Sequence, residues 1–167
     1  MKKDTSPYVP QRDKLKHKLS LNDRIPWSPR HEELLELALG KNTRIVFVKG
    51  PAGTAKTICA VYACLRLLND AKISDIIYVR SAVESADKSL GFLPGTADEK
   101  LSFYNMPFSE KLEELLLKED ISALIKDKRV SMFPVNFSRG MSWNSKAIIF
   151  DEAQNSSRKE IITVLTR

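Results

Sequence analysis

The sequence predicts an α/β protein in which helices cover both faces of a mostly parallel sheet. Three apolar runs of strand type carry this prediction, at 44–48, 76–79 and 147–150. Helical patterns separate these runs, and strands that alternate with helices usually form parallel sheets. The last run shows no polar alternation, which is typical of a strand that is buried on both faces.

The elements before the first run follow from helix capping and periodicity. Ser28 fits a helix N-cap with Pro29 at the first helical position. Apolar residues then recur at helical spacing until Gly40, where we expect the helix to end. Residues 1–29 are rich in Lys, Pro and polar residues, so we expect a flexible basic arm or an extended lead-in there and a core over 30–167.

The middle of the chain is less regular. Gly91 to Gly95 forms a turn-rich break. Helical patterns cover 109–118 and 121–125, and 130–135 has the composition of a further strand. Because Pro134 has no N–H to donate to a ladder, we expect this strand at an edge or near a strand end.

The turn after the first apolar run has the composition of a phosphate-binding loop. Its residues are Gly50, Pro51, Ala52, Gly53, Thr54, Ala55, Lys56 and Thr57. Backbone N–H groups of such a loop, together with the N-terminus of the next helix, face an anion. Lys56 is expected to reach the phosphates of a nucleotide, and the Thr57 hydroxyl to bind Mg²⁺.

One loop position departs from the usual pattern. Ala55 stands where a phosphate-binding loop has its second glycine. We expect Ala55 in helical φ/ψ, because Lys56 and Thr57 begin a helix. The alternative is a positive φ, at which a Cβ costs about 1–2 kcal/mol.

The acids that end the last strand complete this candidate site. The carboxyl ends of parallel strands lie on the edge of the sheet that holds the loop, so Asp151 can share Mg²⁺ with Thr57, directly or through water. Glu152 is then placed to orient or deprotonate an attacking water, while Lys56 offsets charge on the transferred phosphoryl group. The alternative is an ordinary helix N-terminus, where acids are favourable.

Composition limits the class of protein. No apolar run approaches the roughly 20 residues of a membrane span, and Met1 to Asp4 lead into polar sequence, so we expect a cytoplasmic protein. Cys59 and Cys64 are five residues apart on one predicted helix, which favours two reduced, partly buried thiols over a disulfide or a metal site.

The positive charge is concentrated near the N-terminus. Residues 1–30 hold eight Lys or Arg and three Asp or Glu, a net charge of +5, whereas the whole chain carries +6. Any binding to a polyanion is therefore expected to depend on this segment. The alternative is a solvated tail without a partner.

Four segments together resemble a known family. In chain order they are Gly50–Thr57, Val79-Arg80-Ser81-Ala82-Val83-Glu84, Leu90-Gly91-Phe92-Leu93-Pro94-Gly95 and Phe150-Asp151-Glu152-Ala153-Gln154-Asn155. From about Pro26 to Arg167 the chain is similar to PhoH-like proteins, which are phosphate-starvation-inducible P-loop ATPases common in bacteria and phages.

This resemblance implies a three-layer P-loop NTPase core of the RecA-like, superfamily 1 helicase-like type. It implies ATP and Mg²⁺ as ligands and ATPase activity, and it allows coupling of this activity to RNA or single-stranded nucleic acid. Related enzymes often complete their site with a neighbour's arginine, so it also allows a homo-oligomer. The family continues with another strand, so the core is expected to be incomplete at its C-terminus.

The resemblance also assigns roles to single residues. Arg80 and Glu84 line the cleft beyond the phosphates, and Gln154 couples the γ-phosphate to nucleic acid. The family tends to have an adenine-reading glutamine near the start of the first helix. His31 stands in the corresponding stretch, and it either takes that role or is a surface histidine at a helix start.

Three functions remain open at this point. The first is an ATPase with a role linked to RNA or DNA, favoured by Lys56, Thr57, Asp151 and Glu152. The second is a nucleotide-binding switch or scaffold without hydrolysis, favoured by Ala55. The third is a small-molecule kinase, against which the two acids argue, because Glu152 suits water activation better.

Overall fold

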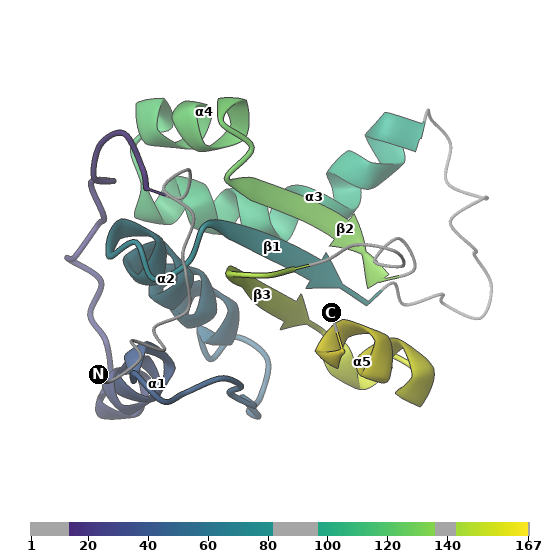
Figure 1. The fold of residues 1–167 in the computed structure, drawn as a ribbon. Helices are drawn as coiled ribbons and strands as arrows, with labels where there is room; N and C mark the ends of the chain where they lie inside the picture. Colours follow the sequence, from purple (N-terminus) through teal and green to yellow (C-terminus); the bar gives the residue numbers. More distant parts are fainter. Residues whose placement is uncertain (1–13, 82–96, 136–142, 167) are drawn as a thin grey trace, which may run out of the picture.

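A computed structural model of this chain describes residues 14–81, 97–135 and 143–166 (Figure 1). Gly91 to Gly95 and Glu84 therefore lie outside the described residues. The helices are α1 (Pro29–Leu39), α2 (Lys56–Asn69), α3 (Ala97–Leu115), α4 (Lys118–Lys126), the 3-10 turn η4 (Ala153–Asn155) and α5 (Arg158–Leu165). The strands are β1 (Asp75–Arg80), β2 (Val130–Pro134) and β3 (Lys146–Asp151).

The three strands form one parallel sheet in the order β2-β1-β3. β1 lies in the centre, with Tyr78 opposite Met132 of β2 and Ile149 of β3. β2 is an edge strand that ends at Pro134, as the missing N–H of proline predicts. The mixed α/β architecture with a parallel sheet confirms the predicted fold class.

Side chains alternate between two cores on the two faces of the sheet. On one face, Ile76 and Tyr78 pack with the buried sides of α2 and α3. On the other face, Ile77 and Val79 pack with Val164 of α5. Figure 1 shows α2 and α3 along one side of the strands and α5 beside β3. The result is the predicted arrangement of helix, sheet and helix layers.

Helix boundaries follow the capping residues. The Ser28 side chain accepts from the backbone N–H of His31, and α1 ends at Gly40, as the sequence predicts. α3 begins at Ala97 and includes Pro107, so it is longer than the helical pattern at 109–118. A proline inside a helix removes a hydrogen bond to the preceding turn and crowds its carbonyl, and burial of Phe108 and Leu112 in the core offsets this cost.

The predicted strand at 44–48 is not formed. This segment is outside every helix and strand, and its apolar side chains face solvent: Phe47 is 83% exposed and Ile45 57%. An apolar run becomes a strand only where a second strand pairs with it. Among the described residues the sheet has three strands, and none pairs with 44–48.

Residues 14–28 form neither helix nor strand and lie along the helices. Leu19 is buried, its N–H donates to the Asn69 side chain at 2.8 Å, and the Asn69 amide donates back to the Leu19 carbonyl at 3.1 Å. Asp120 of α4 accepts the Ser20 N–H at 2.9 Å and contacts His17 at 3.1 Å. The described part of the predicted arm is thus an extended segment packed on the core.

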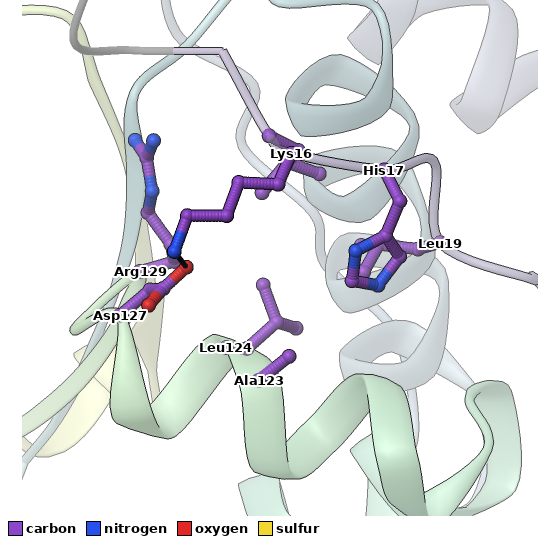
Figure 2. A pocket seen from close by; sticks show the side chains of 8 residues that line it. Lys16, His17, Leu19, Ala123, Leu124, Asp127 and Arg129 are labelled. Carbon is purple, nitrogen blue, oxygen red and sulfur yellow. Dashed lines mark ion pairs between the residues drawn. The ribbon is translucent and has the colours of Figure 1, made fainter.

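Figure 2 shows how this segment meets α4. Lys16 reaches Asp127 at 3.3 Å, and Leu19 and Leu124 belong to the same buried cluster. Between residues 15–19 and the end of α4 is a cavity of about 10 Å³, enough for roughly one water. Arg129 adds a hydrogen bond from its guanidinium to the Lys14 carbonyl at 3.0 Å. Within the described residues, no helix is long and apolar enough to cross a bilayer.

Candidate functional site

The phosphate-loop segment turns into α2 through two residues with positive φ. Gly53 has φ 74°, and Ala55 has φ 57° and ψ 19°. Our expectation of helical φ/ψ at Ala55 is therefore wrong. Ala55 is the N-cap of α2, and its carbonyl accepts the first helical N–H, from Cys59, at 3.0 Å. The turn into the helix demands the left-handed region at the position where the usual motif supplies glycine.

Lys56 folds back over its own loop. Its Nζ donates to the Pro51 carbonyl at 2.5 Å and lies 3.4 Å from the Thr54 hydroxyl, which itself donates to Pro51 at 2.8 Å. The Pro51 carbonyl thus serves as an acceptor for the Lys56 ammonium group within the loop. Charge-assisted bonds to an anion such as phosphate are stronger than a bond to a neutral carbonyl.

Thr57 and Asp151 meet across the site. The Thr57 hydroxyl, in the first turn of α2, lies 3.4 Å from both carboxylate oxygens of Asp151, at the end of β3. The backbone N–H of Glu152 donates to Asp151 Oδ1 at 3.1 Å. One hydroxyl and one carboxylate are oxygen ligands of the kind Mg²⁺ takes, alongside waters and substrate phosphates. The donor set therefore fits the magnesium ion that the sequence predicts.

A third residue, which the sequence analysis missed, also contacts Asp151. The Tyr78 hydroxyl donates to Asp151 Oδ2 at 2.6 Å, and Tyr78 is buried. Burial, followed by this hydrogen bond, raises the pKa of the Tyr78 phenol well above its usual value. The signal in the sequence was a single tyrosine in the otherwise aliphatic run Ile76-Ile77-Tyr78-Val79.

Glu152 and Gln154 form a pair beside this carboxylate. Glu152 has φ 52° and ψ 34°, which directs the chain out of β3 and into the η4 turn. The Gln154 side-chain amide donates to the Glu152 carboxylate. Gln154 can therefore fix the orientation of the acid that is predicted to act on water.

His31 connects the start of α1 to the loop. The Ser28 N–H points to His31 Nδ1 at 3.2 Å, and His31 Nε2 lies 3.3 Å from the Thr54 carbonyl. With Nδ1 as an acceptor, the ring is the tautomer that donates from Nε2 to Thr54. The Trp27 indole packs edge-on against the imidazole, with 6.0 Å between ring centroids. His31 therefore holds the loop as well as capping the helix.

A cleft of about 510 Å³ joins these groups, a size within the usual range for small-molecule sites. It is lined by Ile25, Pro26, Trp27, His31, the residues Ala52 to Ile58, Lys111, Glu114, Asp151 and Glu152. Four other predicted residues are not among those that line it: Gly50 and Pro51, Arg80 and Gln154. Arg80 lies in register with Asp151 at the end of β1, and Gln154 is exposed next to Glu152.

Comparison with known proteins agrees with this architecture. The sequence profile described as PhoH-like protein matches residues 26–167. The chain belongs to the PhoH-like protein family. Family membership indicates a P-loop ATPase-like protein, which is consistent with the parallel sheet and the loop at the start of α2.

Individual relatives give the extent of the similarity. A PhoH-like protein of Mycobacterium tuberculosis is 38% identical over 130 residues, which are 78% of this chain and 36% of the relative. A PhoH-like protein of Bacillus subtilis is 37% identical over 131 residues, which are 78% of this chain and 41% of the relative. Protein PhoH2 of Bacillus subtilis is 31% identical over 159 residues, covering 90% of this chain and 36% of the relative. The chain thus spans less than half the length of these curated relatives.

Proposed function

We propose that this chain binds ATP together with Mg²⁺ in the cleft and hydrolyses the nucleotide. The observation that carries the proposal is the approach of Thr57 to both carboxylate oxygens of Asp151 at 3.4 Å. The two residues are 94 positions apart in the chain, and the fold brings together the hydroxyl and the carboxylate that a magnesium–phosphate site uses. Family membership supports the same conclusion.

Each residue of the site then has a separate task. The N–H groups between Gly50 and Thr57 surround the phosphates, and Lys56 leaves the Pro51 carbonyl to contact them. Thr57 and Asp151 hold Mg²⁺, which supplies charge stabilisation to the phosphoryl group when bound. Glu152 orients the attacking water and accepts its proton, while Gln154 keeps the Glu152 carboxylate in place.

A nucleotide-binding switch without hydrolysis is the second candidate. It is favoured by two departures of the loop: Lys56 is engaged by the Pro51 carbonyl, and Ala55 adopts a positive φ where the usual motif has glycine. The two candidates differ only in the fate of bound ATP. Hydrolysis requires Glu152, whereas binding requires Lys56.

Two variants separate these possibilities. Lys56→Ala removes the loop cation, and we expect ATP affinity to fall at least about tenfold, since charge-assisted bonds to phosphate contribute on the order of 1.5–3 kcal/mol. Glu152→Gln keeps the shape of the side chain, so we expect ATP binding within about twofold of the original chain and a loss of phosphate release of about 10²-fold or more. ATP binding by the original chain with no phosphate release above background favours the switch, whereas equal, measurable release by Glu152→Gln and the original chain contradicts the role of Glu152. Unchanged ATP affinity in folded Lys56→Ala contradicts the nucleotide site altogether.

We further propose that hydrolysis is coupled to RNA or single-stranded nucleic acid through the basic N-terminal segment. Lys14 and Lys18 are exposed in its described part, and residues 1–30 carry a net charge of +5. Phosphate release measured with and without RNA tests the coupling. Binding should weaken with salt, by about one unit of log–log slope for each phosphate contacted. RNA affinity that is equal for the chain and for a variant with Lys14 and Lys18 changed to Gln argues for a solvated segment without this role.

A further inference from the structure

We propose that Tyr78 is a positioning residue for Asp151. The Tyr78 hydroxyl holds one oxygen of the Asp151 carboxylate, so that the carboxylate stays turned toward Thr57. The inference rests on the proposed function, because it concerns the pair of residues assigned to Mg²⁺. It adds a residue that contacts neither the nucleotide nor the metal and acts through Asp151.

The hydrogen bond itself is short and buried. The Tyr78 hydroxyl lies 2.6 Å from Asp151 Oδ2, and the side chain of Tyr78 is 1% exposed. A buried phenol needs an acceptor, since leaving it unpaired costs about 1–3 kcal/mol, and here the acceptor is the carboxylate. The bond therefore has a definite geometry that solvent does not replace.

The phenol ring is fixed from behind. It stacks on Phe108 of α3, with 4.9 Å between ring centroids and 20° between ring planes. Phe108 is itself fully buried in the core between α3 and the sheet. Because the ring is held by β1 on one side and by α3 on the other, its hydroxyl is a rigid point against which Asp151 can be placed.

Strand register explains why Tyr78 can reach the carboxylate. Tyr78 pairs with Ile149 in β3, and Asp151 follows two residues later on the same face of the sheet. A residue two positions further along the neighbouring strand is within reach of a side chain as long as tyrosine, and the Tyr78 hydroxyl does reach Asp151 Oδ2. The hydroxyl thus approaches Asp151 from the sheet, while Thr57 approaches it from α2.

The contacts on Asp151 divide between its two oxygens. Oδ2 accepts from Tyr78, and Oδ1 accepts the N–H of Glu152 at 3.1 Å. Thr57 lies at 3.4 Å from both oxygens. A carboxylate held in this way keeps one orientation, so a metal ion does not have to order it on binding.

The hydroxyl is not required for packing. A phenylalanine at position 78 fills the same space against Phe108 and the aliphatic neighbours of the core. The only polar contact made by the Tyr78 side chain in the described structure is the one to Asp151. The hydroxyl therefore has its effect at the carboxylate.

The test is the dependence of ATP affinity on Mg²⁺, measured by titration of the full chain in excess Mg²⁺ and again in EDTA. For Tyr78→Phe we expect affinity in Mg²⁺ to fall about tenfold, the lower end of losses seen when a residue supporting a metal ligand is removed. Affinity in EDTA should change by less than about twofold. The ratio of the two affinities is informative because a partly unfolded sample lowers both values equally.

Tyr62→Phe is the matched control. Tyr62 donates to the carboxylate of Asp23 at the same distance, 2.6 Å, and also accepts from Arg66 at 3.2 Å, so the control removes a buried hydroxyl–carboxylate bond at another place. Its ratio should equal that of the original chain. Phe108→Leu keeps the Tyr78 hydroxyl and removes the ring behind it, so it provides a second test if Tyr78→Phe does not fold; we expect a smaller loss of the ratio, about threefold.

The outcomes separate the two proposals. If the original chain binds no ATP in Mg²⁺, the proposed function fails and this inference falls with it. If the original chain binds ATP more tightly with Mg²⁺ than without it, and Tyr78→Phe and Phe108→Leu keep the same ratio, the role of Tyr78 is overturned while the proposed function stands. An equal loss of the ratio in Tyr62→Phe also overturns it, because the effect is then not specific to Asp151.

Discussion

Replacing Ala55 with glycine should relieve strain at the entrance to α2. Ala55 has φ 57° and ψ 19°, a conformation in which a Cβ costs about 1–2 kcal/mol relative to glycine. Two effects oppose the relief. Glycine makes the unfolded chain more flexible, which costs about 0.4–1 kcal/mol of stability. Removing the partly buried Ala55 methyl also costs a part of the roughly 0.8 kcal/mol that a buried methylene contributes. The net change in the free energy of unfolding is therefore small.

A matched substitution isolates the strain. Ala52 lies in the same loop, is exposed, and is not among the residues of the described structure with positive φ. Ala52→Gly has the same effect on the unfolded chain but relieves no strain. We expect Ala55→Gly to be more stable than Ala52→Gly by about 1 kcal/mol, the strain relief less the cost of the methyl group.

Urea unfolding followed by circular dichroism measures this difference. About 1 kcal/mol corresponds to about 2–4 °C in the midpoint of thermal unfolding for a chain of this size, so both methods resolve it. If Ala55→Gly is as unstable as Ala52→Gly, or less stable, then the left-handed conformation at Ala55 carries no strain and the reasoning is refuted.

Two further predictions concern the core. Leu19→Ala should lower the free energy of unfolding by about 2–4 kcal/mol, because Leu19 is 6% exposed. As a control, Leu37→Ala should change it by less than about 0.5 kcal/mol, because Leu37 is 56% exposed. Equal effects of the two substitutions in urea unfolding contradict the packing of residues 14–28 on the helices. Burial raises the pKa of the Cys64 thiol to about 12 from an ordinary value of 9.0. The unfolded chain then releases this proton first, so stability falls as pH rises from about 9 toward 12, and the original chain should lose about 1.4 kcal/mol more than Cys64→Ala between pH 8 and pH 10. If the free energy of unfolding changes with pH in the same way for both proteins, burial does not raise the pKa of the Cys64 thiol.

Local signals were sufficient for most of the fold. The N-cap at Ser28, the break at Gly40 and the apolar runs at 76–79 and 147–150 each identify an element from its own residues. α5 also had such a signal, the capping box of Ser157 and Glu160, which our sequence analysis overlooked. These features are readable because capping and periodicity depend only on neighbours in the chain.

Features that depend on distant partners were not predictable in this way. The run 44–48 has the composition of a strand, but strand formation also requires a pairing partner, which composition does not reveal. The packing of residues 14–28 depends on Asn69 and Asp120, which lie about 50 and 100 positions away. The contact between Tyr78 and Asp151 follows only from the register of β1 and β3, which the sequence leaves open.

The distribution of left-handed residues connects the fold to the site. Within the described structure, five residues other than glycine have positive φ: Ala55, Ala71, Lys128, Ser145 and Glu152. Three of them, Ala71, Lys128 and Ser145, stand in the turns that lead into β1, β2 and β3, where the chain reverses from a helix or loop into the sheet. Ala71 and Lys128 directly follow the C-caps of α2 and α4, where a left-handed residue is common, so these residues reflect architecture.

Ala55 and Glu152 are different, because both lie at the opposite edge and line the cleft. Ala55 sets the direction in which Lys56 and Thr57 enter α2, and Glu152 turns the chain after Asp151 so that its own carboxylate meets Gln154. Each therefore bears strain at a point that aims the functional side chains, and strain of this kind persists where the surrounding structure over-determines the conformation. Thr57 and Asp151 meet between these two turns, so the geometry of the proposed metal pair depends on both.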